Sequence, residues 1–177
     1  RNRVLPIRLG DISVDGYVGG KIDRVLHSRI LSESARTEIM PEAVQAFVER
    51  VDDRWKPGQG FWRGEFWGKW VLSAIAAQKY TGSSDLLQTI RTAVKEVLAT
   101  QDANGYIGTY HDSSFVHVER GMNWNVWCRK YTLWGLVEAY ELLSDPAVLD
   151  GACRCLDHLM TEVGPGAANL IETGKLH

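Results

Sequence analysis

The chain has 177 residues, of which 45% are hydrophobic and 24% are charged, so its composition is that of a globular protein with a buried core and argues against disorder. Lys and Arg number 20 against 22 Asp and Glu, which gives a formal net charge of −2, and no basic run could neutralise a series of phosphates. No apolar stretch approaches the roughly 20 residues that span a bilayer. Composition therefore argues against both nucleic acid and membrane as partners.

The three cysteines, Cys128, Cys153 and Cys155, are an odd number in a chain large enough to fold without cross-links, so they do not predict a disulfide framework. Cys153 and Cys155 lie two apart on a predicted helix and face different directions, which argues against a zinc pair. The absence of a disulfide pattern favours a reducing, cytoplasmic compartment. Because the chain begins at Arg1, a signal peptide could have preceded it, and a secreted or periplasmic location stays open.

The first predicted elements are two amphipathic helices. One carries its apolar residues at Ile22, Val25, Leu26 and Ile30. The other follows Pro41 and carries Val44, Phe47, Val48 and Val51. We expect these two helices to pack together as a pair.

The clearest pattern is a repeated apolar stripe, found over residues 86–98 and again over 148–160. In both copies the apolar residues stand at i, i+1, i+4, i+7, i+8, i+11 and i+12, which is one face of an α-helix. A segment that is apolar nearly all round precedes each stripe and predicts a buried helix. A short polar turn joins the two members, and Pro146 after an Asp145 cap begins the last helix. The predicted antiparallel pairs are 64–80 with 84–100 and 125–143 with 146–163.

Buried helices that alternate with amphipathic ones, at a period of some sixty residues, are typical of an α/α toroid or an α-solenoid. The long connection 101–123 contains an Asn104-Gly105 turn and a short segment, 106–110, that we interpret as extended. Long structured loops tend to be functional, so we expect it at the open end of the ring. Its polar residues lack the spacing of a metal site, and we interpret them as side chains of a surface loop that face solvent: His111, Asp112 and His117.

Two clusters of aromatic and polar residues, 61–70 and 123–131, stand at the beginnings of the two buried helices. Indoles suit both cores and sugar-binding clefts. Glu65 could contact a ligand, as proton donor or as acceptor for sugar hydroxyls, or it could cap its helix or pair with Lys69. Asn125 could cap its helix, which is the better supported role, or bind a hydroxylated ligand. The residues expected to share one substrate-binding mouth are Glu65, Trp67, Tyr110, Trp124 and Asn125.

Several strings of the sequence together resemble glycoside hydrolase family 127, the bacterial β-L-arabinofuranosidases and their relatives. The matching strings are 62–70, 80–82, 104–110 and Trp124-Asn125-Val126-Trp127 ahead of Lys130-Tyr131, with Val14-Asp15-Gly16-Tyr17 near the start. The resemblance implies that residues 1–177 are the N-terminal portion of one (α/α)6 catalytic domain, incomplete at its C-terminal end. The implied activity is that of a retaining exo-glycosidase acting on plant-type or bacterial glycans, with a carbohydrate as its partner.

In the characterised members a cysteine thiolate is the nucleophile, held with other cysteines and a glutamate on zinc, and a second glutamate is the acid/base. All these groups come after the stretch that corresponds to residue 177. The resemblance therefore implies no metal or cofactor within this chain, zinc only in the full-length protein, and a chain that is inactive by itself. Where the arabinofuranosidases carry a His-Glu pair this chain has Asn125-Val126, so the sugar stays open.

Two other readings fit the helix pattern. A noncatalytic α-solenoid interaction domain would also stack helix pairs, although the indoles at both buried-helix starts argue against it. Another (α/α)6 sugar enzyme, such as an epimerase or an unsaturated-uronide hydrolase, would share the ring. No nucleophile elbow, phosphate-binding loop or dinucleotide fingerprint occurs in the sequence.

Overall fold

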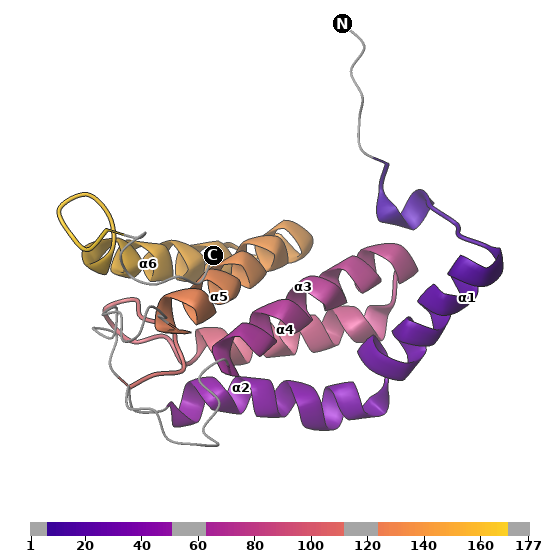
Figure 1. Ribbon diagram of the computed structural model, residues 1–177, viewed down its shortest axis with the longest axis horizontal. Coiled ribbons are helices and arrows are strands. Elements are labelled where there is room, and N and C mark those ends of the chain that lie inside the picture. The colour runs from indigo at the N-terminus through magenta and orange to yellow at the C-terminus, as the bar shows by residue number, and fades with distance from the viewer. Residues whose placement is uncertain (1–6, 51–62, 112–123, 170–177) are drawn as a thin grey trace, which may run out of the picture.

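The structure is a computed structural model that describes residues 7–50, 63–111 and 124–169. All named elements in these ranges are helices, so the predicted all-α class is confirmed (Figure 1). In chain order they are η1 (Leu9–Asp11), α1 (Gly16–Val25), η2 (Leu26–Ile30), η3 (Ala35–Ile39), α2 (Met40–Glu49), α3 (Arg63–Thr81), α4 (Ser84–Leu98), α5 (Trp124–Leu143) and α6 (Pro146–Glu162). None of the helices in the described ranges is long and apolar enough to cross a membrane.

The two predicted helix pairs are confirmed, α3 with α4 and α5 with α6, each bounded within a few residues of its prediction. The second helix of each pair begins at a side-chain cap. Ser83 accepts a hydrogen bond from the Leu86 N–H at 3.2 Å, and Asp145 accepts one from the Ala147 N–H at 3.0 Å. Each cap satisfies a backbone donor that the first turn of a helix leaves unpaired, which ends the turn and starts the helix.

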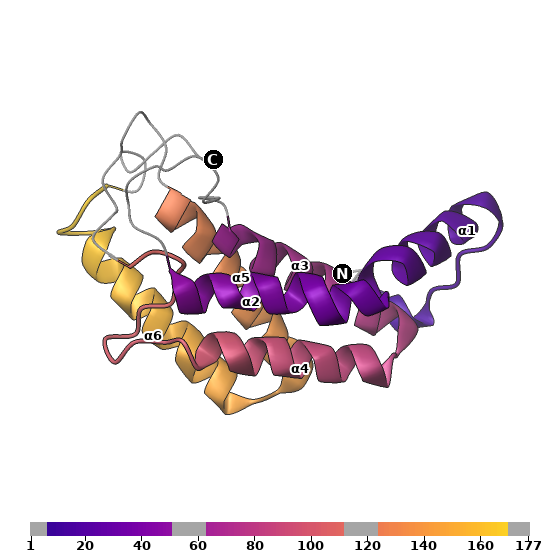
Figure 2. The same cartoon turned by 90° about the horizontal axis from the view of Figure 1, so that it is seen from below.

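The helices form two layers. α3 and α5 lie side by side and run in the same direction, with α4 packed on α3 and α6 packed on α5 (Figure 1). α2 contacts both α3 and α4, and it runs, like α4 and α6, opposite to the inner pair (Figures 1 and 2). The core lies between these helices, where Phe47 of α2 meets Trp67 of α3 edge to face at 6.0 Å between ring centroids.

Glycines bring α3 and α5 into close contact. A Cβ on Gly68 would lie 2.3 Å from the Tyr131 carbonyl oxygen, and one on Gly64 would lie 2.8 Å from the Cβ of Cys128. From the other helix, Gly135 lies against the Trp67 ring. Small residues spaced four apart let two helix backbones approach, so this contact holds the beginnings of α3 and α5 together.

The expected pairing of the two early amphipathic helices is wrong. α1 lies beyond the end of α2 in both views, and α3 is contacted by η1 and η2 (Figures 1 and 2). The physical reason is that the chain between α1 and α2 contains the π-helices η2 and η3, so it does not reverse in a tight turn. Val51, expected at the end of the second helix, lies outside the described residues.

The two apolar stripes differ in burial. In α4 the stripe is covered, and Val94 is 1% exposed. In α6 the inner half of the stripe is buried at Val148, Ala152 and Cys155, whereas Leu156 is 47% exposed and Met160 48% exposed. The outer half of the α6 stripe is therefore only half covered by the described residues.

Candidate functional site

Glu65 lies in the first turn of α3 at the end where α5 also begins (Figure 1). Its residue surface is only 8% exposed. One carboxylate oxygen, Oε1, lies 3.1 Å from the Lys69 ammonium, and the other, Oε2, accepts a hydrogen bond from Nε1 of Trp127. The pairing with Lys69 confirms one of the structural interpretations of Glu65, and the bond to Trp127 links the two inner helices through this carboxylate.

Aromatic and cationic side chains surround Glu65 on the neighbouring surface of both helices. We call this surface the aromatic–lysine face and define it by Phe66, Lys69, Trp127, Lys130, Tyr131 and Trp134. Phe66 is 51% exposed and Trp134 is 52% exposed. The α5 members recur every three or four residues, so they share one side of that helix. Large aromatic groups that stay open to solvent beside polar groups are typical of a surface that binds a ligand.

The rings of this face are arranged around Tyr131. Trp127 meets it edge to face at 5.3 Å, and Trp134 is stacked on it at 6.3 Å with an interplanar angle of 17°. The Lys130 ammonium lies 3.4 Å from the centroid of the Trp127 ring and 4.2 Å from that of Tyr131. Cation–π contacts of this kind hold a flexible lysine in one position.

Asn125 and Tyr110 lie beneath this face rather than on it, and both are fully buried. The Asn125 side chain hydrogen-bonds Tyr106, whose hydroxyl donates to the Tyr110 carbonyl oxygen at 3.1 Å. Burial raises the pKa of Tyr106 to about 12, and burial also raises the pKa of Tyr110. Both phenols thus stay neutral, and their network fixes the loop 101–111 against the beginning of α5.

Trp67, expected to contact substrate, is a core residue. It is fully buried, and its indole N–H donates to the Ala93 carbonyl oxygen of α4 at 3.3 Å. Its position on α3 turns it away from the aromatic–lysine face and towards α2 and α4. A side chain with no exposed surface cannot touch a sugar, so the contact expected of Trp67 is corrected to packing.

The remaining expected residues are placed as follows. Trp124 is half-buried at the first residue of α5, and His111 is exposed at the end of the loop. Asp112 and His117 lie outside the described residues. Glu65 and Asn125 do come from the same end of the inner helices, as expected of a shared mouth. Asn125 and Tyr110, like Trp67, have no exposed surface among the described residues, so their expected contact is likewise corrected to packing. Substrate contact by Glu65 or Trp124 stays a prediction.

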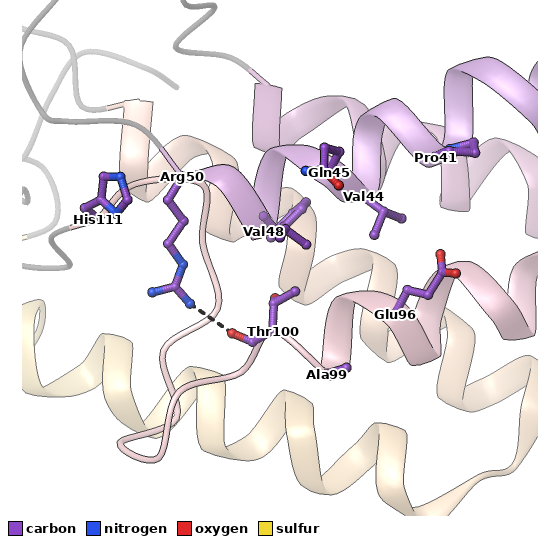
Figure 3. A pocket seen from close by; sticks show the side chains of 10 residues that line it. Pro41, Val44, Gln45, Val48, Arg50, Glu96, Ala99, Thr100 and His111 are labelled. Atoms are coloured by element: carbon purple, nitrogen blue, oxygen red, sulfur yellow. Dashed lines mark hydrogen bonds between the residues drawn. The ribbon is translucent and has the colours of Figure 1, made fainter.

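Two cavities adjoin the helices. One, of about 440 Å³, lies between α2 and α3 and is bordered by Phe66 and Lys69 of the aromatic–lysine face. The other, of about 740 Å³, lies between α2 and α4, where Arg50 and His111 stand at one end (Figure 3). Arg50 is already engaged there, by Asp102 at 2.7 Å and by the Thr100 carbonyl oxygen at 2.9 Å.

The cysteines do not form a metal or nucleophilic site. Cys128 and Cys155 are buried and Cys153 is exposed, and none of the three is in a disulfide. Burial raises the pKa of Cys128 to about 12, so its thiol stays protonated and unreactive at neutral pH. Within the described ranges no three His, Cys, Asp or Glu side chains gather in a way that could hold a metal ion. The residues present therefore do not fit the zinc–thiolate centre that the resemblance implies for the later part of the domain.

Sequence reasoning missed Trp127, Lys130 and Tyr131 as site residues although they stood in the second aromatic cluster. The signal was their spacing together with Trp134, which places aromatic and cationic groups on one helical face. Asn125 and Cys128 of the same cluster fall on the opposite, buried face. Only the packing of α5 on α3 and α6 distinguishes the two faces.

Comparison with known proteins gives one positive finding. A family model described as "Beta-L-arabinofuranosidase, GH127 catalytic domain" matches residues 21–174. Neither a curated protein nor a solved structure matches the chain.

Proposed function

Because the chain belongs to the GH127 family of β-L-arabinofuranosidase catalytic domains, a family of glycoside hydrolases, we propose that its aromatic–lysine face forms part of a sugar-binding cleft. The enzyme is a retaining exo-glycosidase of β-L-arabinofuranosidase type that acts on plant-type or bacterial glycans. A carbohydrate is then its partner. Family membership favours this function over a noncatalytic solenoid, an epimerase or an unsaturated-uronide hydrolase.

The observation that carries the proposal is the hydrogen bond between Trp127 and Glu65, at the end where the inner helices α3 and α5 both begin. It presents a carboxylate beside indole and phenol rings, with Trp134 half exposed next to them. Aromatic rings pack against the apolar C–H faces of sugars, while carboxylate, ammonium and amide groups bind hydroxyls. The face offers both kinds of contact within a few ångströms.

Glu65 serves in this proposal as a binding and positioning group. Both of its oxygens already accept hydrogen bonds, from Lys69 and Trp127, so its geometry is fixed before any ligand arrives. Groups held in advance lose little entropy on binding. Retention requires a nucleophile and a proton donor in fixed relation, and in this proposal both come from the part of the domain that follows His177.

We further propose that residues 1–177 are the N-terminal portion of one (α/α)6 domain. The exposed half of the α6 stripe supports this, because Leu156 and Met160 occupy the positions that Val94 and Leu98 fill in α4. Leu98 lies against Gly151 of α6, in the next helix pair, so a further pair would cover Met160 in the same way. Zinc, if the full-length enzyme uses it as its characterised relatives do, would bind outside the described residues.

The cleft is tested by titrating the chain with methyl β-L-arabinofuranoside and a panel of neutral methyl glycosides and measuring binding by isothermal titration calorimetry. We expect binding in the millimolar range by at least one glycoside, and Trp127→Ala should weaken it by about tenfold, since buried aromatic anchors dominate such contacts. Trp127→Phe keeps a ring but loses the hydrogen-bond donor to Glu65. Its affinity for the glycoside should lie between those of the wild type and Trp127→Ala.

Trp67→Phe is the matched control, because Trp67 is a fully buried indole on the neighbouring helix. It should lower stability and leave the dissociation constant for the glycoside unchanged. If the wild type and Trp127→Ala bind the glycoside with equal affinity, and circular dichroism shows that both proteins are folded, a sugar site on this face is refuted.

A further inference from the structure

The aromatic–lysine face contains two ammonium groups, and one carboxylate, that of Glu65, lies beside them. Lys69 pairs with Glu65 at 3.1 Å, and its Nζ also lies 5.1 Å from the centroid of the Tyr131 ring. Lys130 lies over the same ring at 4.2 Å. The two ammonium groups thus share Tyr131, and the set of Glu65, Lys69 and Lys130 has a net charge of +1.

Of the two lysines, Lys130 is the one that has no carboxylate partner among the described residues. It forms no ion pair with any carboxylate of the residues that the structure describes, whereas Lys69 and Lys79 each have one. The nearest partners of the two Glu65 oxygens are Lys69 and Trp127, and Glu65 acts on Lys130 only from a longer distance. What holds Lys130 is the Trp127 ring, 3.4 Å from its ammonium.

The surroundings of Lys130 favour the arrival of a negative charge. Its pKa is lowered, first by burial against the rings and also by the charge of Lys69, while Glu65 opposes the shift. An ammonium that is partly desolvated and repelled by a like charge gains more from a new anion than a fully hydrated one does. The rings also exclude water from one side of any group that binds there.

From this geometry we infer that Lys130, with Lys69 beside it, binds an anionic substituent, a carboxylate or a sulfate ester, on the sugar that the aromatic–lysine face recognises. The inference rests on the proposed sugar-binding function and specifies its substrate class as an acidic sugar. Trp134 and Tyr131 provide the surface for the sugar ring. Lys130 provides a point charge that the Trp127 ring has already positioned.

The chain offers a matched pair of lysines for the test. Lys130 is on the face, and Lys79, paired with Glu138 at 3.6 Å, lies near the other end of α3. Lys130→Gln and Lys79→Gln make the same change in net charge and in side-chain type. Lys130→Arg keeps the charge at the site.

The full 177-residue chain and these variants are titrated with three probes: methyl β-D-glucopyranosiduronate, the 6-sulfate of methyl β-D-glucopyranoside, and neutral methyl β-D-glucopyranoside. We expect an anionic probe to bind about tenfold or more tightly than the neutral one, as one charge-assisted hydrogen bond allows, with the difference shrinking at high salt. Lys130→Gln should abolish the preference, and Lys130→Arg and Lys79→Gln should keep it. Which anionic probe shows the preference identifies carboxylate or sulfate as the group.

Two outcomes would overturn the inference, and only the second would also refute the proposed sugar-binding cleft. Equal affinities for all three probes, unchanged in Lys130→Gln, would refute the anionic subsite while leaving neutral sugar binding intact. If neither these probes nor the glycoside panel used on Trp127→Ala bind, the proposed sugar-binding cleft is refuted as well. Circular dichroism of each variant establishes that a lost preference is not a lost fold.

Discussion

At the scale of single residues, Arg129 organises a polar group inside the protein. It is fully buried, and its guanidinium donates to Glu162 at 2.5 Å and to Nδ1 of His158 at 3.0 Å. Arginine has no acceptor, so Nδ1 of His158 must offer a lone pair and the imidazole must be neutral, with its proton on Nε2. The pKa of His158 is lowered accordingly, first by burial and then by Arg129, with Glu162 and Asp102 opposing.

This arrangement predicts a loss of stability in mild acid. In the unfolded chain His158 takes up a proton at its ordinary pKa of 6.5, whereas in the folded chain it does so only at lower pH. Between the two values the unfolded state binds more protons, so the free energy of unfolding falls as the pH falls below about 6.5. His158→Asn keeps an acceptor near the position of Nδ1 but does not titrate, and its stability should depend less on pH in this window.

Thermal unfolding between pH 5 and 7.5 measures the difference. His27→Asn is the control, since His27 is exposed and its Nδ1 lies 2.8 Å from the nearby Asp23 carbonyl oxygen, one turn earlier in the chain. If His158→Asn and the wild type lose stability in parallel over this range, the neutral state of His158 contributes nothing measurable.

At the scale of elements, the contact between α3 and α5 decides the site. Gly64, Gly68 and Gly135 allow the helices to approach until Glu65 of one meets Trp127 of the other. The shape of the aromatic–lysine face thus depends on backbone distance as well as on its own side chains. A change that separates the helices should alter stability and ligand binding together.

Gly68→Ala tests this dependence. Its Cβ would lie 2.3 Å from the Tyr131 carbonyl oxygen, a backbone atom that cannot move without shifting α5. We expect a loss of about 1–3 kcal/mol in the free energy of unfolding, as overpacking typically costs, and weaker binding of glycosides. Chemical denaturation and calorimetry provide the two measurements.

Gly20→Ala, in α1, is the matched control, because a Cβ there meets nothing within 4 Å. Alanine is favoured over glycine inside a helix by about 1 kcal/mol, so this variant should be neutral or slightly more stable. A Gly68→Ala protein as stable as Gly20→Ala would mean that the α3–α5 contact is looser than its geometry implies.

At the scale of the whole molecule, the described helices form two layers, and apolar side chains at one edge of these layers are half exposed. Leu156, Met160 and, on α5, Val137 are exposed there, at 47%, 48% and 45%. A monomer rarely leaves such a stripe open, and the equivalent stripe on α4 is closed by α5 and α6. The edge therefore suits the next helix pair of the proposed ring.

The proposed division of the domain predicts that the 177-residue chain has no glycosidase activity by itself. Without nucleophile and proton donor nearly all of the chemical rate enhancement is lost, while binding through the aromatic–lysine face persists. The chain and a longer protein that continues past His177 are assayed side by side on aryl β-L-arabinofuranoside and other aryl glycosides. Turnover by the short chain comparable to that of the longer one would place catalysis within residues 1–177, and Glu65 would be the first residue to replace.

The sequence by itself determined the helix pairs, the Asp145 cap and the family. Apolar periodicity reports which residues of a helix are buried, and a capping residue such as Asp145 acts through local bonds, so both can be recognised without neighbours. The Ser83 cap was found only in the structure. The aromatic and polar clusters at the two buried-helix starts also predicted, for a toroid, that the beginnings of α3 and α5 share one end. The helix pairs and the cap depend on contacts within a few residues along the chain.

Only the tertiary structure decided which side of each inner helix is exposed. α3 and α5 are apolar or aromatic nearly all round, so periodicity could not separate Trp67, which packs on α4, from Trp127, which faces Glu65. Likewise nothing local indicated that the chain between α1 and α2 would fail to reverse. Which way a helix faces is set by the helices that dock on it, and those contacts join residues far apart in the sequence.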